Sequence, residues 1–160
     1  MKKDTYIAVV GPSAATPAEH NLGEEVGRLI AEAGGVLVCG GLGGLMEAAA
    51  SGCARAGGRS VGVLPSEDRA GANPYLTTVV ATGMGEARNA IVVRTADAVI
   101  AVRGGFGTLS EIALALKMGK PVVGLGTWEL AKDGTPVDAI VRVDSPADAV
   151  ATALRLAVRR

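Results

Sequence analysis

Short apolar runs alternate with longer helical stretches along the whole chain. The continuous apolar runs predict β-strands at Tyr6–Val10, Val36–Cys39, Ser60–Leu64, Thr77–Ala81, Ala98–Val102, Val122–Leu125 and Ile140–Val143. The stretches between them predict helices at Ala18–Ala33, Gly44–Ala56, Glu86–Thr95, Thr108–Met118 and Pro146–Val158. Strands that are apolar throughout are typical of a parallel sheet covered on both faces. We therefore predict a single α/β domain spanning residues 1–160, with a doubly wound, mainly parallel sheet and helices on both faces.

Polar and glycine-rich segments follow several of the predicted strands, where a parallel sheet collects its ligand-binding loops. These segments are Gly11–Ser13, Gly40–Gly44, Gly83–Arg88 and Gly104–Glu111. We expect all of them to surround one crevice. The connection Gly126–Pro136 is interpreted as an irregular loop that either covers this crevice or lies on the surface.

The segment from Ala101 to Glu111 has the chemistry of a phosphate-binding turn, because an apolar strand leads through glycines into a helix. Gly104, Gly105 and Gly107 would let the backbone approach an anion, and the free amides around Thr108 would hold its charge. The alternative is a capping box, in which Thr108 and Glu111 only satisfy the first amides of the helix. Both interpretations stay open from these residues alone.

The loops after the first two strands add further candidates for phosphate binding. Ser13 has the hydroxyl to donate a hydrogen bond to phosphate as a helix cap, and Gly41 and Gly44 lie in a glycine cluster before the next helix. As a bare pattern, such a cluster is more often a tight turn than a ligand contact.

Arg88 lies near the start of a helix that is otherwise rich in Ala, Ile and Val. Its guanidinium can bind phosphate or a ribose hydroxyl with two hydrogen bonds, although an ordinary surface arginine or an ion pair with Glu86 or Asp97 fits the spacing equally well. We expect the fourth and fifth strands to be neighbours, which would bring Arg88 and Glu111 together across the crevice.

Several common site types are disfavoured. The glycine patterns match neither the dinucleotide-binding fingerprint nor the P-loop, which needs a lysine. His20 is the only histidine, and Cys39 and Cys53 have no metal-ligand spacing, so we predict no metal site and two reduced, packed thiols.

Composition limits the choice of partners. The chain has 160 residues with 16 basic and 16 acidic side chains, which cancel, and its few aromatic residues leave little surface for stacking unpaired bases. We therefore expect no nucleic-acid partner.

The first apolar run ends early at Gly11-Pro12, and no run reaches membrane-spanning length, so we expect a cytoplasmic protein with no membrane association.

The helix at Thr108–Met118 carries apolar residues around more than one face. Such a helix is either sandwiched inside the fold or shared with a second copy of the chain. We favour a homodimer or a higher homo-oligomer.

Taken together, several motifs resemble those of the Lonely guy (LOG) family and its Rossmann-like superfamily. They are Gly40-Gly41-x-x-Gly44-x-Met46, Met84-x-x-x-Arg88, Asp97-Ala98 and Gly104-Gly105-Phe106-Gly107-Thr108-Leu109-x-Glu111. The resemblance covers roughly residues 7–125. Members of this superfamily were long labelled as lysine decarboxylases, but this chain shows no pyridoxal-phosphate constellation.

The resemblance implies a nucleotide-binding protein that acts as a phosphoribohydrolase. LOG enzymes cleave the N-glycosidic bond of nucleoside 5′-monophosphates to free base and ribose 5-phosphate, with no cofactor required. Their catalytic arginine and glutamate fall on Arg88 and Glu111. In this interpretation Glu111 supports the sugar as positive charge develops on it, and the turn at residues 104–108 grips the 5′-phosphate.

Three positions depart from the LOG pattern. Arg103 stands where that pattern has proline, Asn89 where it has lysine, and Ser110 where it has the first of two acidic residues. The segments Gly83–Asn89 and Gly119–Trp128 are more similar to a sister branch that includes molybdenum cofactor carrier proteins, which hold a pterin phosphate. The alternative is therefore a non-catalytic carrier with molybdenum cofactor as its ligand. A third and weaker class comes from the superfamily's DNA-processing members.

Overall fold

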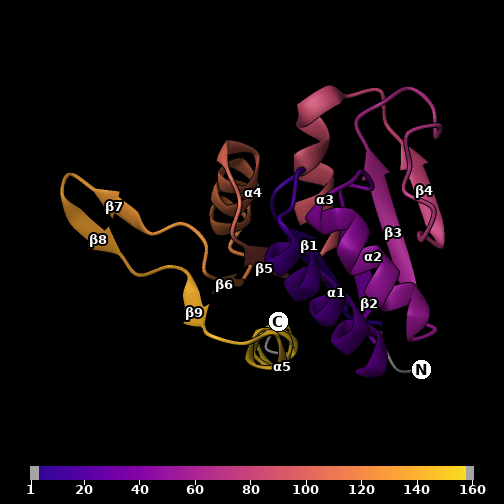
Figure 1. The fold of residues 1–160 in the computed structure, drawn as a ribbon. Coiled ribbons are helices and arrows are strands. Elements are labelled where there is room, and N and C mark those ends of the chain that lie inside the picture. The colour runs from indigo at the N-terminus through magenta and orange to yellow at the C-terminus, as the bar shows by residue number, and fades with distance from the viewer. Residues whose placement is uncertain (1–3, 158–160) are drawn as a thin grey trace.

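The fold is a parallel sheet of seven strands between two layers of helices, as seen in a computed structural model that describes residues 4–157 (Figure 1). The strands of this sheet are β1 (Tyr6–Val10), β2 (Val36–Cys39), β3 (Arg59–Leu64), β4 (Thr78–Ala81), β5 (Ala98–Val102), β6 (Val122–Leu125) and β9 (Val141–Val143). The helices are α1 (Pro17–Glu32), α2 (Leu45–Arg55), α3 (Asn89–Thr95), α4 (Phe106–Lys117) and α5 (Pro146–Ala157), with a 3₁₀ turn η1 at Gly85–Arg88. The predicted doubly wound α/β fold is confirmed. Val158, the predicted end of the last helix, lies outside the described residues.

The strand order is β4-β3-β2-β1-β5-β6-β9, and every neighbouring pair is parallel. The chain builds outward from β1 to β4 at one edge and then returns to place β5 on the other side of β1. The expectation that the fourth and fifth strands are neighbours is therefore wrong. Their separation follows from the crossover through η1 and α3, which carries the chain back over the sheet and changes the direction of winding.

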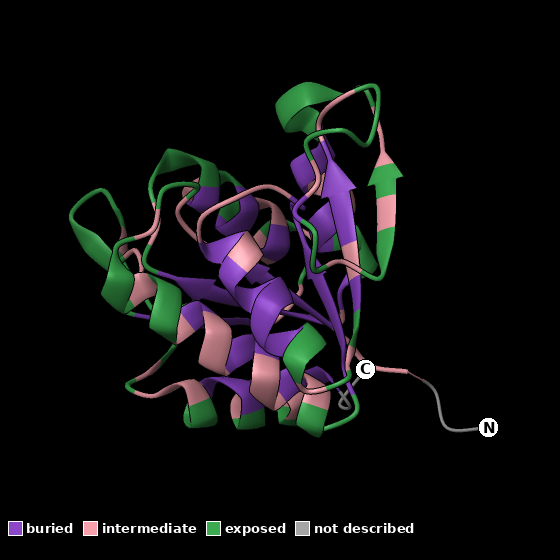
Figure 2. Ribbon diagram, turned by 45° about the vertical axis from the view of Figure 1, so that its right-hand side comes forward, coloured by how far each residue is buried: buried purple, intermediate pink, exposed green. Residues whose placement is uncertain are grey.

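Each face of the sheet has its own apolar core. On one face, Ile7, Val9 and Ile100 pack with residues of α1, α2 and α5; on the other, Ala8 and Val99 pack with α3 and α4. Alternate residues of each strand point to opposite faces, so continuous apolar runs supply both layers. Figure 2 shows the buried residues concentrated along the sheet and the inward sides of the helices.

A small hairpin replaces part of the connection that we interpreted as irregular. Strands β7 (Leu130–Lys132) and β8 (Thr135–Val137) pair antiparallel and extend away from the body of the protein (Figure 1). Asp133 and Gly134 join them with φ values of 51° and 74°. Two consecutive positive φ values are typical of the turn that Asp-Gly favours between antiparallel strands. The Asp133-Gly134 pair in the sequence therefore indicates this hairpin, which we had interpreted as an irregular loop.

No helix within residues 4–157 is long and apolar enough to cross a membrane. The two cysteines of this part of the chain, Cys39 and Cys53, are free and buried, as predicted.

Candidate functional site

A cavity of about 590 Å³ opens at the carboxyl ends of the central strands, where the strand order reverses around β1. Ligands of doubly wound sheets bind at this position. The cavity is lined by Gly11, Pro12, Ser13, Ala14, Leu42, Met46, Pro65, Glu86, Arg88, Asn89, Gly105, Phe106, Gly107, Thr108 and Glu111. All four loops that we expected around one crevice contribute to it, together with Pro65 after β3.

The start of α4 forms one wall of this cavity and presents unpaired backbone amides. Gly105 is the N-cap and supplies no side chain, and the first amide bonded in the helix is that of Leu109, which donates to the Gly105 carbonyl at 3.0 Å. Within the described residues, the amides of residues 105–108 donate no hydrogen bond. Free amides at a helix start, with the positive end of the helix dipole, favour an anion.

The capping-box alternative for this segment is wrong. The helix begins at Phe106, two residues before the predicted start, so Thr108 lies inside its first turn instead of at the N-cap. Thr108 is buried against Gly104, where a Cβ would lie 2.2 Å from the threonine Oγ1. Gly104 also has a φ of 100°, so a side chain there is excluded by both conformation and space.

Arg88 is buried and held by backbone carbonyls. Its Nε donates to the Val63 carbonyl at 2.8 Å, one terminal nitrogen donates to the Gly40 carbonyl at 3.3 Å, and the other donates to Asn89 Oδ1. The surface arginine and the ion pair with Glu86 or Asp97 are therefore wrong, because Arg88 forms no ion pair in the described chain and Asp97 accepts from the Tyr6 amide. A buried guanidinium without a carboxylate partner supplies positive charge to the cavity.

Glu111 lies on the cavity wall with 7% of its surface exposed. Burial raises the pKa of Glu111 to about 7, and the nearby charge of Arg88 opposes this shift. No hydrogen bond to the Glu111 carboxyl forms among residues 4–157. Arg88 and Glu111 are thus brought together, although by the returning η1 segment and not by adjacent strands.

Two of the departures from the LOG pattern contact each other. Asn89 Nδ2 donates to Ser110 Oγ at 3.1 Å, and Ser110 Oγ donates to the Gly107 carbonyl at 2.7 Å. Because Asn89 also accepts from Arg88, a chain of hydrogen bonds runs from the buried guanidinium to the first turn of α4. Sequence reasoning treated these positions as separate, since nothing in their spacing places them in contact.

Of the other candidate phosphate-binding residues, only Ser13 lines the cavity, and Gly41 and Gly44 lie outside its lining. Ser13 lines the cavity, but the cap of α1 is Thr16, which forms a capping box with Glu19. Gly41 and Gly44 have φ values of 77° and 65° and do not line the cavity. A Cβ on Gly44 would lie 2.4 Å from the Ser13 carbonyl oxygen, so this glycine permits the close approach of two loops. A ligand contact for either glycine stays a prediction.

Arg103 adopts a left-handed conformation with a φ of 49°. Proline cannot reach this φ, so the backbone entering the glycine turn differs here from one that carries proline. The turn is held by the Arg103 amide, which donates to the Leu125 carbonyl at 3.1 Å, and by Thr127 Oγ1, which donates to the Arg103 carbonyl at 2.6 Å. Strained residues of this kind are enriched at functional sites.

Comparison of the chain with known proteins identifies its family. The model of the SLOG cluster4 family matches residues 4–150. The chain belongs to this family. An uncharacterized protein of Archaeoglobus fulgidus is 47% identical over 119 residues, which are 74% of this chain and 78% of that protein.

Solved structures similar to this SLOG protein include proteins that are described as binding or carrying molybdenum cofactor. The molybdenum cofactor binding protein of Rippkaea orientalis is 33% identical, with a TM-score of 0.87 over 98% of this chain and 99% of that one. The molybdenum cofactor carrier protein of Chlamydomonas reinhardtii is 32% identical, with a TM-score of 0.86 over the same shares of each chain. DNA processing protein A of Helicobacter pylori is 19% identical, with a TM-score of 0.68 over 94% of this chain and 80% of that one, and shares the fold alone.

Proposed function

We propose that this SLOG protein binds a phosphorylated pterin, with molybdenum cofactor as the ligand, and carries it without chemical change. The observation that carries this proposal is the uncapped start of α4, whose free amides line a cavity of about 590 Å³. Similar proteins over nearly the whole chain are described as molybdenum cofactor binding or carrier proteins, which supports the same ligand class.

The phosphate would be held by the amides of residues 105–108. Backbone amides suit a carrier, because they bind phosphate through a fixed geometry and have no group to transfer. Arg88 supplies the balancing positive charge, and its three hydrogen bonds hold that charge in place before the ligand arrives. Pre-ordered donors reduce the entropy lost on binding.

The ring system would occupy the rest of the cavity. Leu42, Met46 and Pro65 give this part an apolar lining suited to a flat heterocycle. The Glu111 carboxyl, with a pKa of about 7, exchanges its proton near neutral pH and is able to donate to or accept from a pterin ring nitrogen or oxygen.

The proposal is tested by incubating the purified protein with molybdenum cofactor under anaerobic conditions and separating free from bound ligand by gel filtration. We expect molybdenum and pterin to elute with the protein in equimolar amounts. Gly107→Asp places a carboxylate at the amides of α4 and should abolish this co-elution, whereas Ala113→Asp, on an exposed position of the same helix, should retain it. Co-elution unaffected by Gly107→Asp, or its absence in the unchanged protein, would contradict the proposal.

A second candidate function is hydrolysis of a nucleoside 5′-monophosphate, and the specific observation that favours it is Glu111. A buried carboxyl with a pKa raised to about 7 is suited to acid–base work beside a sugar. The two functions are separated by incubating the protein with a panel of nucleoside monophosphates and measuring ribose 5-phosphate. The carrier proposal expects none; release that disappears in Glu111→Gln would establish the hydrolase instead.

A further inference from the structure

A second cavity of about 390 Å³ adjoins the phosphate-binding turn. It shares Pro12 and Ala14 with the main cavity, and it takes Gly104 from the turn where the main cavity takes the next residue, Gly105. A group bound at the amides of α4 therefore has space on two sides. The remaining lining residues are Glu19, Arg103, Gly126, Thr127 and Trp128.

Arg103 gives this second cavity its positive charge. Its guanidinium lies against Gly126, where a Cβ would collide with it, so the glycine leaves room for the arginine side chain. Within the described chain, the guanidinium makes no hydrogen bond and no ion pair. All of its donors are consequently available to a ligand in the cavity.

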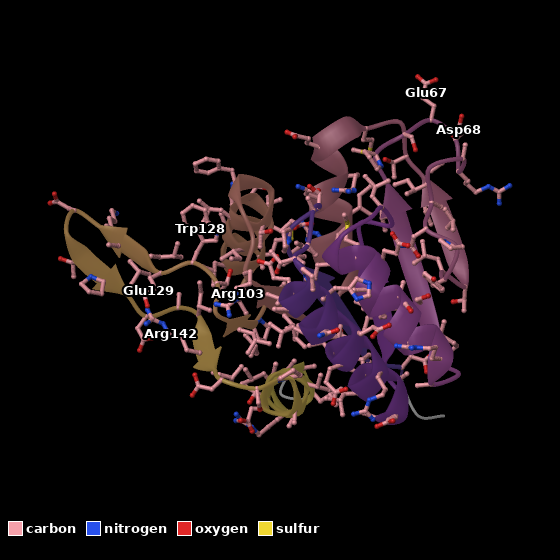
Figure 3. All side chains as sticks on the ribbon, viewed as in Figure 1. Glu67, Asp68, Arg103, Trp128, Glu129 and Arg142 are labelled. Carbon is pink, nitrogen blue, oxygen red and sulfur yellow. The ribbon has the colours of Figure 1, made fainter. Side chains whose placement is uncertain are left out.

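Trp128 also lines this second cavity. Its Nε1 donates to the Gly105 carbonyl at 3.1 Å, and its ring contacts that of Phe106 with centroids 5.7 Å apart. Figure 3 shows Arg103 and Trp128 on the hairpin side of the molecule, with Trp128 beside α4. The contact to Gly105 ties the aromatic wall to the same turn that ends in the free amides.

We propose that the second cavity is a subsite for a second phosphoryl group, so that the protein accepts ligands in which the first phosphate is extended as a diphosphate. This inference rests on the proposed function, because it places the first phosphate at the start of α4. Arg103 then acts as a specificity-determining residue that distinguishes a diphosphate from a monophosphate. Its charge is partly balanced by Glu19, whose carboxylate accepts from the Thr16 amide at 2.8 Å.

The test compares inorganic phosphate with pyrophosphate by isothermal titration calorimetry. The unchanged protein should bind pyrophosphate more tightly than phosphate, and Arg103→Gln should remove about tenfold of the pyrophosphate affinity while leaving phosphate binding unchanged. Arg103→Gly is a second variant that keeps the fold, because glycine adopts the left-handed φ of 49° without strain. Arg155→Gln, an exposed arginine on α5, is the matched control and should bind both anions normally.

Glu19→Gln provides a test in the opposite direction. It removes a negative charge from the second cavity but keeps a side chain able to complete the capping box with Thr16, so pyrophosphate affinity should rise. If both Arg103 variants bind pyrophosphate like the unchanged protein, the subsite is wrong while the carrier proposal stands. If the unchanged protein binds neither anion, the subsite and the proposed phosphate site are both wrong.

Discussion

Glu111 is a buried carboxyl whose surroundings oppose its ionisation. Its pKa is about 7 in the folded protein and ordinarily 4.5, because burial disfavours the charged form. The folded state therefore holds the proton more tightly than the unfolded state. The contribution of Glu111 to stability is constant below about pH 4.5, falls as the pH rises to about 7, and then levels off after a loss of about 3 kcal/mol.

Glu111→Gln should remove this dependence on pH. Urea unfolding of the variant and the unchanged protein at about pH 4 and about pH 8 should show their stability difference shifting by about 3 kcal/mol in favour of the variant. Glu67→Gln, on the exposed connection between β3 and β4, is the control and should show no such shift (Figure 3). A pH-independent difference for Glu111→Gln would show that its carboxyl titrates normally.

Arg88 should tune that carboxyl through its charge. Because the guanidinium lowers the pKa of Glu111, Arg88→Gln should move this pKa further above its present value of about 7. The variant should also lose about 2 kcal/mol of stability, since two buried carbonyls lose a charged donor. Carbon-13 NMR of the glutamate carboxyls across a pH series measures the first effect, with Arg94→Gln on α3 as the exposed control. An unchanged Glu111 titration would place Arg88 too far away to act.

At the scale of elements, Gly107 in the first turn of α4 makes the helix less stable but leaves the neighbouring backbone amides uncovered. A Cβ built on Gly107 meets no atom within 4 Å, and alanine favours a helix over glycine by about 1 kcal/mol. Gly107→Ala should therefore raise the thermal unfolding temperature of the free protein while weakening phosphate binding, because its methyl group enters the cavity. Ala113→Gly on the same helix should do the reverse for stability and leave binding unchanged. Stabilisation without any loss of phosphate affinity would remove α4 from the site.

The elements also show where sequence reasoning succeeds and where it stops. Strands β1, β2, β5 and β6 were predicted to the residue, because buried parallel strands are apolar without interruption and end abruptly at glycine or polar residues. The start of α4 was misplaced because Gly105 caps the helix with no side chain, so Thr108 was the nearest conventional signal. The strand order was wrong at β4, since no local pattern records how a crossover returns to the sheet.

The site followed the same division. The sequence singled out the glycine turns, Arg88 and Glu111, because the chemistry of each is local to its loop. The structure places Arg88, Glu111 and the turn at Gly105 around one cavity, while their roles in binding or catalysis stay predictions. The contact between Asn89 and Ser110 and the left-handed Arg103 were not found from sequence, because both depend on backbone paths set by distant parts of the chain. The types of residue in a loop indicate which chemistry it can perform, but the distances between loops are known only once the sheet has been assembled.

At the scale of the whole molecule, the exposed apolar surface bears on assembly. Phe106 is 82% exposed, and Met84 and Val141 are also large exposed apolar residues. Single apolar residues of this kind are common on protein surfaces and do not by themselves indicate an interface. The homodimer therefore stays a prediction from the sequence, where the helix that became α4 carries apolar residues around more than one face. Sedimentation velocity over a range of protein concentrations measures this. A monomer at all concentrations would contradict the expectation.

The central claim is that the free amides at the start of α4 hold the phosphate of a carried pterin. A crystal structure of the protein with bound molybdenum cofactor tests it most directly. The account predicts phosphate density within hydrogen-bond distance of the amide nitrogens of residues 105–108, with the ring system in the cavity beside Arg88 and Glu111. Cofactor bound elsewhere, with these amides facing only water, would contradict the account.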